Sequence, residues 1–453
     1  MSDQVAEVSA TYLVEAADKG LPMGYKQTEV GVIPEDWDVQ AGRQLFTKIQ
    51  DGTHFSPKIS GGEYLYITSK NIKFGFLDFK SAEYIDRLQH EAIYNRCDVK
   101  KNDILLTKDG AKTGNAALNT LDEQFSLLSS VAFLRLDKNK DCPAFFLQQI
   151  LSDEFQNYIK EEMSGNAITR LTLKKINGLK FYVPCKIEQT AIANALSDVD
   201  ELISELEKLI AKKQAIKTAS MQQLLTGRTR LPQFALHEDG TPKGYKKSEL
   251  GEIPEDWDAI KMSELARIQR GASPRPIDSP VWFNRNSSVG WLRISDVSKT
   301  NKYLTETTQS LSELGIANSR FVSKNNLVMS ICATVGKPII TKKDLCIHDG
   351  FVVFNGLSAN QDLMYYILKE LEDKWGKQGQ TGSQMNLNTD LINGTYIAIP
   401  GDEQEQAAIA TIFSDMDEEI QALEQRLGKT RQIKQGMMQE LLTGKTRLVA
   451  PAV

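Results

Sequence analysis

Two blocks of the sequence, residues 40–187 and 260–401, carry loops in which basic and hydroxyl-bearing side chains alternate with glycine. Lysine and arginine bind phosphate oxygens, and serine, threonine, asparagine and glutamine also hydrogen-bond base edges. These loops therefore have the composition of a nucleic-acid contact surface, although each residue taken singly also fits a solvated surface position. The candidate contact residues are Thr53, His54, Ser56, Lys58, Lys108, Lys112, Thr113 and Arg170 in the first block, and Arg270, Ser273, Arg275, Arg293, Thr334, Lys337, Gln384 and Asn386 in the second.

The charge distribution is compatible with such a surface. The whole chain has 54 Lys and Arg against 59 Asp and Glu, a net charge of −5 that by itself argues against a polyanionic partner. Residues 40–187, however, hold 21 basic and 17 acidic side chains, and residues 260–401 hold 16 and 12. Two mildly basic blocks thus lie within an acidic frame, a weak indication of two contact modules.

Motifs for catalysis on DNA or nucleotides are missing from the sequence. The T-G-K-T at 443–446 lacks the first glycine of a P-loop, because Gln439 stands at that position, and T-G-R-T at 226–229 identifies the pattern as a helix-end motif. An adenine methyltransferase needs an Asn/Asp-Pro-Pro-aromatic box, and the chain has no Pro-Pro dipeptide. Asp362, Glu372 and Lys374 resemble a nuclease cluster only at chance spacing. We therefore expect a non-catalytic chain.

Cysteine and histidine usage predicts neither disulfides nor metal. The five cysteines are scattered without a C-x-x-C pair, and the four histidines show no metal-ligand spacing with them. The first twenty residues lack the basic start and apolar run of a signal peptide, and no stretch of about 18 apolar residues occurs. We expect a soluble cytoplasmic protein with no membrane segment.

Internal repetition is the strongest feature of the sequence. GYKQTEVGVIPEDWD at 24–38 recurs as GYKKSELGEIPEDWD at 244–258, with 11 of 15 positions identical. A second repeat relates residues 188–231 to residues 405–448, with 24 of 44 positions identical. The blocks between these repeats have similar lengths but diverge. The chain therefore comprises two copies of one unit, each with a leading segment, a variable domain and a long helix.

The second repeat has the periodicity of a long amphipathic helix. Apolar residues recur every three or four positions in both copies, which is the pattern of a coiled-coil seam. Gly227 and Gly444 follow Leu-Leu-Thr where such a helix would end. The predicted seam residues are Ile192, Val199, Ile203, Leu206, Ile210, Ile216 and Leu224 in the first helix, and Ile409, Met416, Ile420, Leu423, Leu427, Ile433 and Leu441 in the second.

Charge segregation along these helices predicts their direction. Residues 188–207 contain six acids and no base, and residues 208–230 contain six bases and no acid. The second helix repeats the pattern, with eight acids in residues 402–424 and six bases against one acid in residues 426–447. Parallel packing would oppose like charges, whereas antiparallel packing opposes acid and base. We expect an antiparallel pair, with the two domains related by an approximate twofold axis.

The variable blocks share a faint third repeat. KNDILLTKDGAKTGNAAL from Lys101 compares with KNNLVMSICATVGKPII from Lys324, and both indicate a strand, a glycine-bearing loop and a strand. The fold class is therefore α+β, with two mixed α/β domains separated by two long antiparallel helices. Trp37 and Trp257, at matched positions of the leading segments, are expected to anchor those segments in the domain cores.

These motifs together resemble the specificity subunit of type I restriction-modification systems. The resemblance rests on the G-Y-K and I-P-x-D-W segments, the variable domains and the helices ending in L-L-T-G-[KR]-T-R-L, and it extends from about Gly24 to Val449. It implies two target recognition domains that read the halves of a bipartite, asymmetric site on double-stranded DNA. A coiled-coil adaptor with two variable protein- or ligand-binding domains is the alternative, and a stand-alone DNA enzyme is a third reading.

The resemblance also implies partners and a domain plan. Two modification subunits carrying N6-adenine methyltransferase activity and the restriction subunits would bind the helices. S-adenosylmethionine, ATP and Mg²⁺ would be held by those partners, with no cofactor on this chain. The expected segments are an N-terminal extension at 1–23, recognition domains at 24–187 and 244–401, spacer helices at 188–230 and 402–449, and a linker at 231–243.

Overall fold

A computed structural model describes residues 21–59, 61–163, 170–378 and 387–449, except for the side chains of residues 373 and 376–378. The chain forms two compact units. The first combines the residues up to Glu207 with those from Gln425 onward, and the second is Lys208–Glu424. Each long helix therefore contributes one end to each unit.

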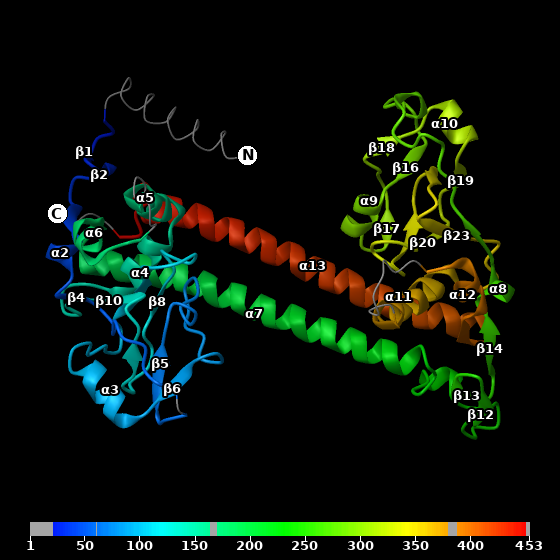
Figure 1. Ribbon diagram of the computed structural model, residues 1–453, viewed down its shortest axis with the longest axis horizontal. Helices are drawn as coiled ribbons and strands as arrows, with labels where there is room; N and C mark the ends of the chain where they lie inside the picture. Colours follow the sequence, from blue (N-terminus) through cyan, green and yellow to red (C-terminus); the bar gives the residue numbers. More distant parts are fainter. Residues whose placement is uncertain (1–20, 60, 164–169, 379–386, 450–453) are drawn as a thin grey trace. The chain divides into compact units, whose positions relative to one another are not determined.

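The first unit is a mixed α/β domain together with one end of each long helix. Thr172 caps the short helix before the closing strand, since its Oγ1 accepts a hydrogen bond from the backbone N of Lys175 at 3.3 Å. In chain order its elements are β1 (Tyr25–Thr28), β2 (Gly31–Pro34), β3 (Asp38–Ala41), α2 (Gly42–Leu45), β4 (Lys48–Asp51), β5 (Tyr64–Ile67), β6 (Glu83–Ile85), α3 (Arg87–Tyr94), β7 (Ile104–Thr107), β8 (Ala116–Leu118), β9 (Ser126–Leu127), β10 (Val131–Arg135), α4 (Pro143–Leu151), α5 (Asp153–Met163), α6 (Leu173–Gly178), β11 (Lys180–Val183) and the start of α7 (Lys186–Leu224) (Figure 1).

The second unit repeats this order with different connections. Asn388 caps the helix that matches α6, accepting from the backbone N of Leu391 at 2.7 Å. Its elements are η1 (Pro232–Phe234), β12 (Tyr245–Ser248), β13 (Gly251–Pro254), β14 (Trp257–Lys261), α8 (Met262–Leu265), β15 (Arg267–Arg270), η2 (Pro280–Trp282), β16 (Gly290–Leu292), α9 (Ile294–Lys299), β17 (Tyr303–Leu304), β18 (Gln309–Ser310), α10 (Glu313–Ala317), β19 (Arg320–Val322), β20 (Leu327–Ser330), β21 (Pro338–Thr341), β22 (Leu345–Ile347), β23 (Phe351–Asn355), α11 (Gln361–Gln378), α12 (Thr389–Gly394), β24 (Tyr396–Pro400) and the start of α13 (Glu403–Leu441).

The two domains share a sheet topology, as the faint third repeat predicts. The order β4-β10-β7-β8 in the first matches β15-β23-β20-β21 in the second, and the order β6-β5-β9 matches β18-β16-β22. Strands β7 and β8, like β20 and β21, are antiparallel neighbours joined by a glycine-bearing loop. Asn102 and Asn325 adopt left-handed φ values of 69° and 63° at the same turn before that motif. The mixed α/β prediction is confirmed.

The leading segment of each unit pairs with its closing strand. In the first unit β3 is antiparallel to β11, and in the second β14 is antiparallel to β24. Because each closing strand leads into a long helix, this pairing fixes where the helix leaves its domain. Trp37 and Trp257 are 0% and 1% exposed in the cores, so the anchoring role predicted for them is confirmed.

Acid-on-base pairing between α7 and α13 occurs within each unit. In the first unit Arg431 pairs with Glu207 at 2.6 Å, and Lys434 pairs with Asp200 at 2.7 Å. The second unit contains the corresponding pairs, Lys213 with Glu419 at 2.7 Å and Lys217 with Asp417. In both units residues late in one helix therefore contact residues early in the other, the antiparallel direction that the charge segregation predicts. No helix in the described part of the chain combines the length and apolarity that crossing a membrane requires.

For two residues, the prediction that they lie in the seam is wrong. Ile216 is 43% exposed and Ile433 is 49% exposed, and they occupy matched positions of the repeat. The adjacent lysines, Lys217 and Lys434, point inward instead, because Asp417 and Asp200 offer them ion pairs. Buried seam residues are Ile192, Leu206, Ile210, Leu224, Ile409, Ile420 and Leu441, and half-buried ones are Val199, Ile203, Met416, Leu423 and Leu427.

A cluster of Asp36, Trp37, Glu188 and Arg447, built around the buried Trp37 and Glu188 and here called the first Arg–Glu–Trp cluster, joins the helix ends to the domain. Glu188 is 0% exposed and accepts a hydrogen bond from Trp37 Nε1 at 2.9 Å. Arg447 donates through Nη2 to Glu188 at 2.7 Å, and through Nη2 and Nη1 to the two carboxylate oxygens of Asp36 at 2.8 and 2.9 Å. Its guanidinium lies 5.8 Å from the Trp37 ring centroid. These hydrogen bonds from Arg447 hold the pKa of Asp36 below its ordinary value.

The second Arg–Glu–Trp cluster, of Arg230, Asp256, Trp257 and Glu405, has the same construction. Trp257 Nε1 donates to Glu405 at 3.1 Å, and Arg230 donates to both oxygens of Glu405 at 2.8 and 2.7 Å. Arg230 also binds Asp256 at 2.7 and 3.1 Å. Although burial alone would raise it, hydrogen bonds from Arg230 and Lys243 lower the pKa of Asp256 to about 2.

The helix-end glycines belong to the same contacts. Gly444 and Gly227 have φ values of 73° and 68°, and a Cβ on either would lie 2.5 Å from a ring carbon of Pro34 or Pro254. Only glycine satisfies both the conformation and the space. Tyr25 donates to the carbonyl oxygen of Gly444 at 2.9 Å. The repeated sequence motifs therefore meet at one place in each unit.

Removing one arginine should destabilise one unit selectively. We predict that Arg447→Ala lowers the free energy of unfolding of the first unit by about 3 kcal/mol, because it strands the buried carboxylate of Glu188. Arg230→Ala should do the same to the second unit. Urea unfolding of the full chain checks both variants.

Arg431→Ala is the matched control, since its ion pair with Glu207 is 58% and 48% exposed at the two side chains. We expect it to cost about 1 kcal/mol or less. Equal losses for Arg447→Ala and Arg431→Ala would contradict a special role for the cluster.

Candidate nucleic-acid interface

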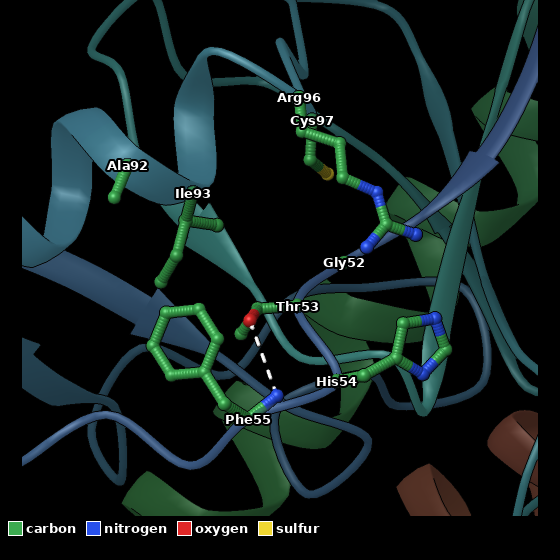
Figure 2. A pocket seen from close by; sticks show the side chains of 8 residues that line it. All are labelled: Gly52, Thr53, His54, Phe55, Ala92, Ile93, Arg96 and Cys97. Carbon is green, nitrogen blue, oxygen red and sulfur yellow. Dashed lines mark hydrogen bonds between the residues drawn. The ribbon is translucent and has the colours of Figure 1, made fainter.

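The first predicted loop follows β4 and borders a hollow of about 350 Å³ (Figure 2). Thr53 is buried, and its Oγ1 accepts a hydrogen bond from the backbone N of Phe55 at 3.3 Å. The preceding Gly52 leaves no room for a side chain, because a Cβ would lie 2.0 Å from the carbonyl oxygen of Leu127. The loop is thus held rigidly against the sheet while its following side chains face outward. His54, Ser56 and Lys58 are exposed.

Figure 2 shows how the exposed side chains border this hollow. The Phe55 ring lies on the side of Ile93, while His54 and Arg96 border the other side. Both of these basic side chains also approach Asp51, His54 Nε2 at 3.5 Å and Arg96 Nη2 at 3.4 Å. The hollow therefore combines an apolar wall with nitrogen donors, a combination suited to the edge or face of a base.

Lys108 does not fit its predicted role as a phosphate contact. It is 1% exposed, and its Nζ lies 3.3 Å from Asp51 and 3.2 Å from Asp109. Two carboxylates hold the lysine inside the domain, beneath the loop rather than on it. Its position is structural, because it joins the β4 loop to the loop after β7.

A second hollow, of about 400 Å³, gathers three lysines. Lys70 and Lys73, from the segment after β5, and Lys112, from the loop after β7, line it together with Ser69, Ser81, Asp109, Gly110 and Ala111. Thr113 is half-buried and donates to the carbonyl oxygen of Gly110 at 2.7 Å, so its hydroxyl shapes the loop. Arg170 is 45% exposed and pairs with Asp109 at 2.7 Å. The structure thus brings Lys112, Thr113 and Arg170 to one part of the surface.

In the second domain three predicted residues converge on Asp349. Ser273 donates to its carboxylate at 2.7 Å, Arg275 lies 3.5 Å from it, and Arg270 donates to its backbone carbonyl at 2.6 Å. The Ser273 hydrogen bond holds the pKa of Asp349 below its ordinary value. The arginines keep outward-facing donors, since Arg275 is 71% exposed. This loop occupies the topological place of residues 51–58 in the first domain.

Three further predicted residues of the second domain, Arg293, Thr334 and Lys337, lie around α9. Lys337 Nζ donates to the carbonyl oxygen of Ser298 at 3.2 Å, and Thr334 Oγ1 lies 3.3 Å from the Ser298 hydroxyl. Burial and the nearby Lys369 lower the pKa of Lys337. Arg293 is half-buried at the N-terminus of α9. Gln384 and Asn386 lie outside the described residues.

Sequence reasoning missed several members of these surfaces. Lys70 and Lys73 follow strand β5, and the three lysines between positions 70 and 80, against one acid, are a signal that the sequence offers. Phe55 and Arg96 could not be found that way, because only the fold places the end of α3 beside the β4 loop. No group of three or more histidine, cysteine, aspartate or glutamate side chains suited to a metal ion occurs in the described ranges.

Comparison with known families agrees with this arrangement. Residues 34–218 and 254–435, well over half of the chain, match the type I restriction modification DNA specificity domain. The putative type I restriction enzyme MjaX specificity subunit of Methanocaldococcus jannaschii is 25% identical over 442 residues, covering 94% of this chain and 97% of the relative. The MjaVIII specificity subunit of the same organism is 26% identical over 432 residues, covering 92% and 94%.

Solved structures share the fold. The specificity subunit of a type I restriction-modification system from M. genitalium aligns with a TM-score of 0.55 at 16% identity, covering 89% of this chain and 96% of its own. A chain from a study of assembly and conformational transition of a type I system aligns with a TM-score of 0.54 at 14% identity, covering 91% and 99%. With two matched domains, and both of its duplicated halves covered, the chain belongs to the family of type I restriction-modification DNA specificity subunits, which are non-catalytic.

Proposed function

We propose that the chain recognises a bipartite, asymmetric site on double-stranded DNA, with each domain reading one half. The observation that carries this proposal is that the same frame holds two different loops. The β4 loop presents His54, Ser56 and Lys58, whereas the equivalent loop presents Ser273 and Arg275 around an aspartate. Because base readout depends on side-chain identity, equal frames with unequal loops select unequal half-sites.

We further propose that α7 and α13 form a coiled-coil spacer related by a pseudo-twofold axis and that this spacer sets the distance between the half-sites. The matched ion pairs Asp200–Lys434 and Asp417–Lys217 support an equivalent packing of the helices in both units. Two modification subunits would bind the spacer, and restriction subunits would join them. The partners would hold S-adenosylmethionine, ATP and Mg²⁺.

The cytoplasm is the compartment that suits this role. All five cysteines, each in the described part of the chain, are free thiols, as is usual in a reducing environment. Family membership also decides against the adaptor alternative, since an adaptor would need no DNA specificity domain.

A methylation map tests the function directly. We expect the genome of the native host to carry a gapped, asymmetric N6-methyladenine motif that disappears when this gene is deleted and returns when it is restored. Single-molecule sequencing reads both half-sites and the gap at once. A motif that persists in the deletion strain would contradict the specificity role.

Lengthening the helices tests the spacer. Seven residues inserted after Glu207 and another seven after Glu424, which are matched positions of the repeat, preserve the pairing and add about 10 Å of helix. We expect the gap in the methylated motif to grow by roughly 3 base pairs while both half-sites stay the same. Insertion into one helix alone is the control and should disrupt assembly. An unchanged gap in the double insertion would reject the spacer.

Charge reversal tests the lysine-lined hollow. Lys70→Glu with Lys112→Glu should weaken DNA binding by the assembled complex and reduce the slope of log affinity against log salt by about 0.9 for each lost phosphate contact. Lys140→Glu, an exposed lysine outside the hollow, is the matched control. An unaltered slope would remove Lys70 and Lys112 from the DNA-facing surface.

A further inference from the structure

A tight hairpin between β5 and β6 of the first domain, residues 71–78, exposes two phenylalanines at its tip. A bridge between Ile72 and Leu77 closes it. The backbone N of Lys73 donates to Phe76 O at 3.0 Å, which completes the turn. Phe74 is 51% exposed and Phe76 is 61% exposed. We call this segment the Phe hairpin.

The backbone at the tip is fixed although the side chains are not covered. Gly75, between the two phenylalanines, donates its N–H to the carbonyl oxygen of Ala116 at 2.9 Å. Its φ of 93° suits glycine, and the side-chain amide of Asn115 donates to the carbonyl oxygen of Ile72 at 3.2 Å. The hairpin is therefore attached to the β7–β8 motif, and its two rings project from a rigid base. A rigid, exposed pair of aromatic rings is suited to binding a partner.

The surroundings of the rings are basic. Lys70 and Lys73, at the base of the hairpin, line the 400 Å³ hollow together with Lys112. Lys73 also lies 3.4 Å from Asp78. Within the described ranges no carboxylate lies within 4 Å of the ammonium groups of Lys70, Lys80 or Lys112. Unpaired cations beside an apolar tip fit a phosphate backbone with bases next to it, whereas the core of a protein interface is depleted of such charges.

We propose that the Phe hairpin is a wedge that inserts at least one phenyl ring at a base step in or beside the half-site bound by the first domain. The inference rests on the proposed function and adds the mode of contact. Phenylalanines that enter a base step unstack it and bend the duplex, while neighbouring lysines hold the phosphates of the deformed strand.

In the described residues of the second domain, the matching connection from β16 to β18 forms no such hairpin. It forms helix α9 and strand β17 instead, and its one aromatic side chain, Tyr303, donates its hydroxyl to Asp362 at 3.1 Å. The deformation should therefore affect one half-site only. Unstacking at one half-site only would distinguish the wedge from a general weakening of DNA binding.

The test uses the full chain assembled with its methyltransferase subunits and a duplex that carries the mapped recognition site. 2-Aminopurine replaces one base at a time across both half-sites and their flanks, and its fluorescence reports unstacking. We expect the wild-type complex to raise the fluorescence near one half-site only. The double variant Phe74→Ala, Phe76→Ala should abolish this rise and weaken specific binding roughly 5- to 150-fold, the range for loss of one aromatic–base stack.

Two further variants separate stacking from folding. Leu88→Ala is the matched control, because Leu88 is an 81% exposed apolar residue of the same domain on α3. It should leave both affinity and fluorescence unchanged. The double variant Phe74→Tyr, Phe76→Tyr preserves the rings and should retain the signal.

Contrary outcomes have distinct meanings. Equal affinity of the Ala double variant and the wild type overturns the wedge, as does reduced affinity with no fluorescence rise in the wild type. Failure of the Ala double variant to co-purify with the methyltransferase subunits in the absence of DNA would show a protein-docking surface and also overturn it. A wild-type complex without preference for the mapped duplex would instead refute the proposed function itself.

Discussion

A buried glutamate at the start of each long helix is the constraint on which the structure depends. Glu188 and Glu405 lie inside the protein, where a lone carboxylate would be costly, and each is compensated by a tryptophan N–H and an arginine guanidinium. In each case the arginine lies in the segment that follows the other long helix. In each unit, the buried charge of this glutamate thus fixes the positions of the domain, the start of one long helix and the segment after the other relative to one another.

This requirement explains why the leading segments and the helix ends could be predicted from sequence. Both tryptophans, both helix-end glycines and both arginines lie in repeated motifs, and repetition at a fixed offset identifies them without any structure. Repetition does not reveal the direction in which each side chain points. The apolar periodicity predicts Ile216 and Ile433 in the seam, yet Lys217 and Lys434 take the inward positions, since an aspartate opposite each lysine compensates its burial.

The candidate interface was less accessible to sequence reasoning for a related reason. Lys108 has the residue type of a phosphate contact, but Asp51, 57 positions earlier in the chain, holds it inside the domain. Only the fold brings that carboxylate to it. The structure brings Arg270, Ser273 and Arg275 together, and Asp349, which organises them, lies on a distant strand connection. Residue type predicts the chemistry of a loop, and long-range packing decides which atoms remain available.

The division of the chain into units also bears on how the protein is made. The second unit is one continuous segment, Lys208–Glu424, whereas the first combines residues that precede and follow that segment. During synthesis the second unit has all of its residues while Arg447 is still untranslated. In the first unit, Glu188 therefore lacks its arginine partner until Arg447 has been translated. A ribosome that stops before Arg447 would release a chain in which the second unit is complete and the first lacks the partner of Glu188.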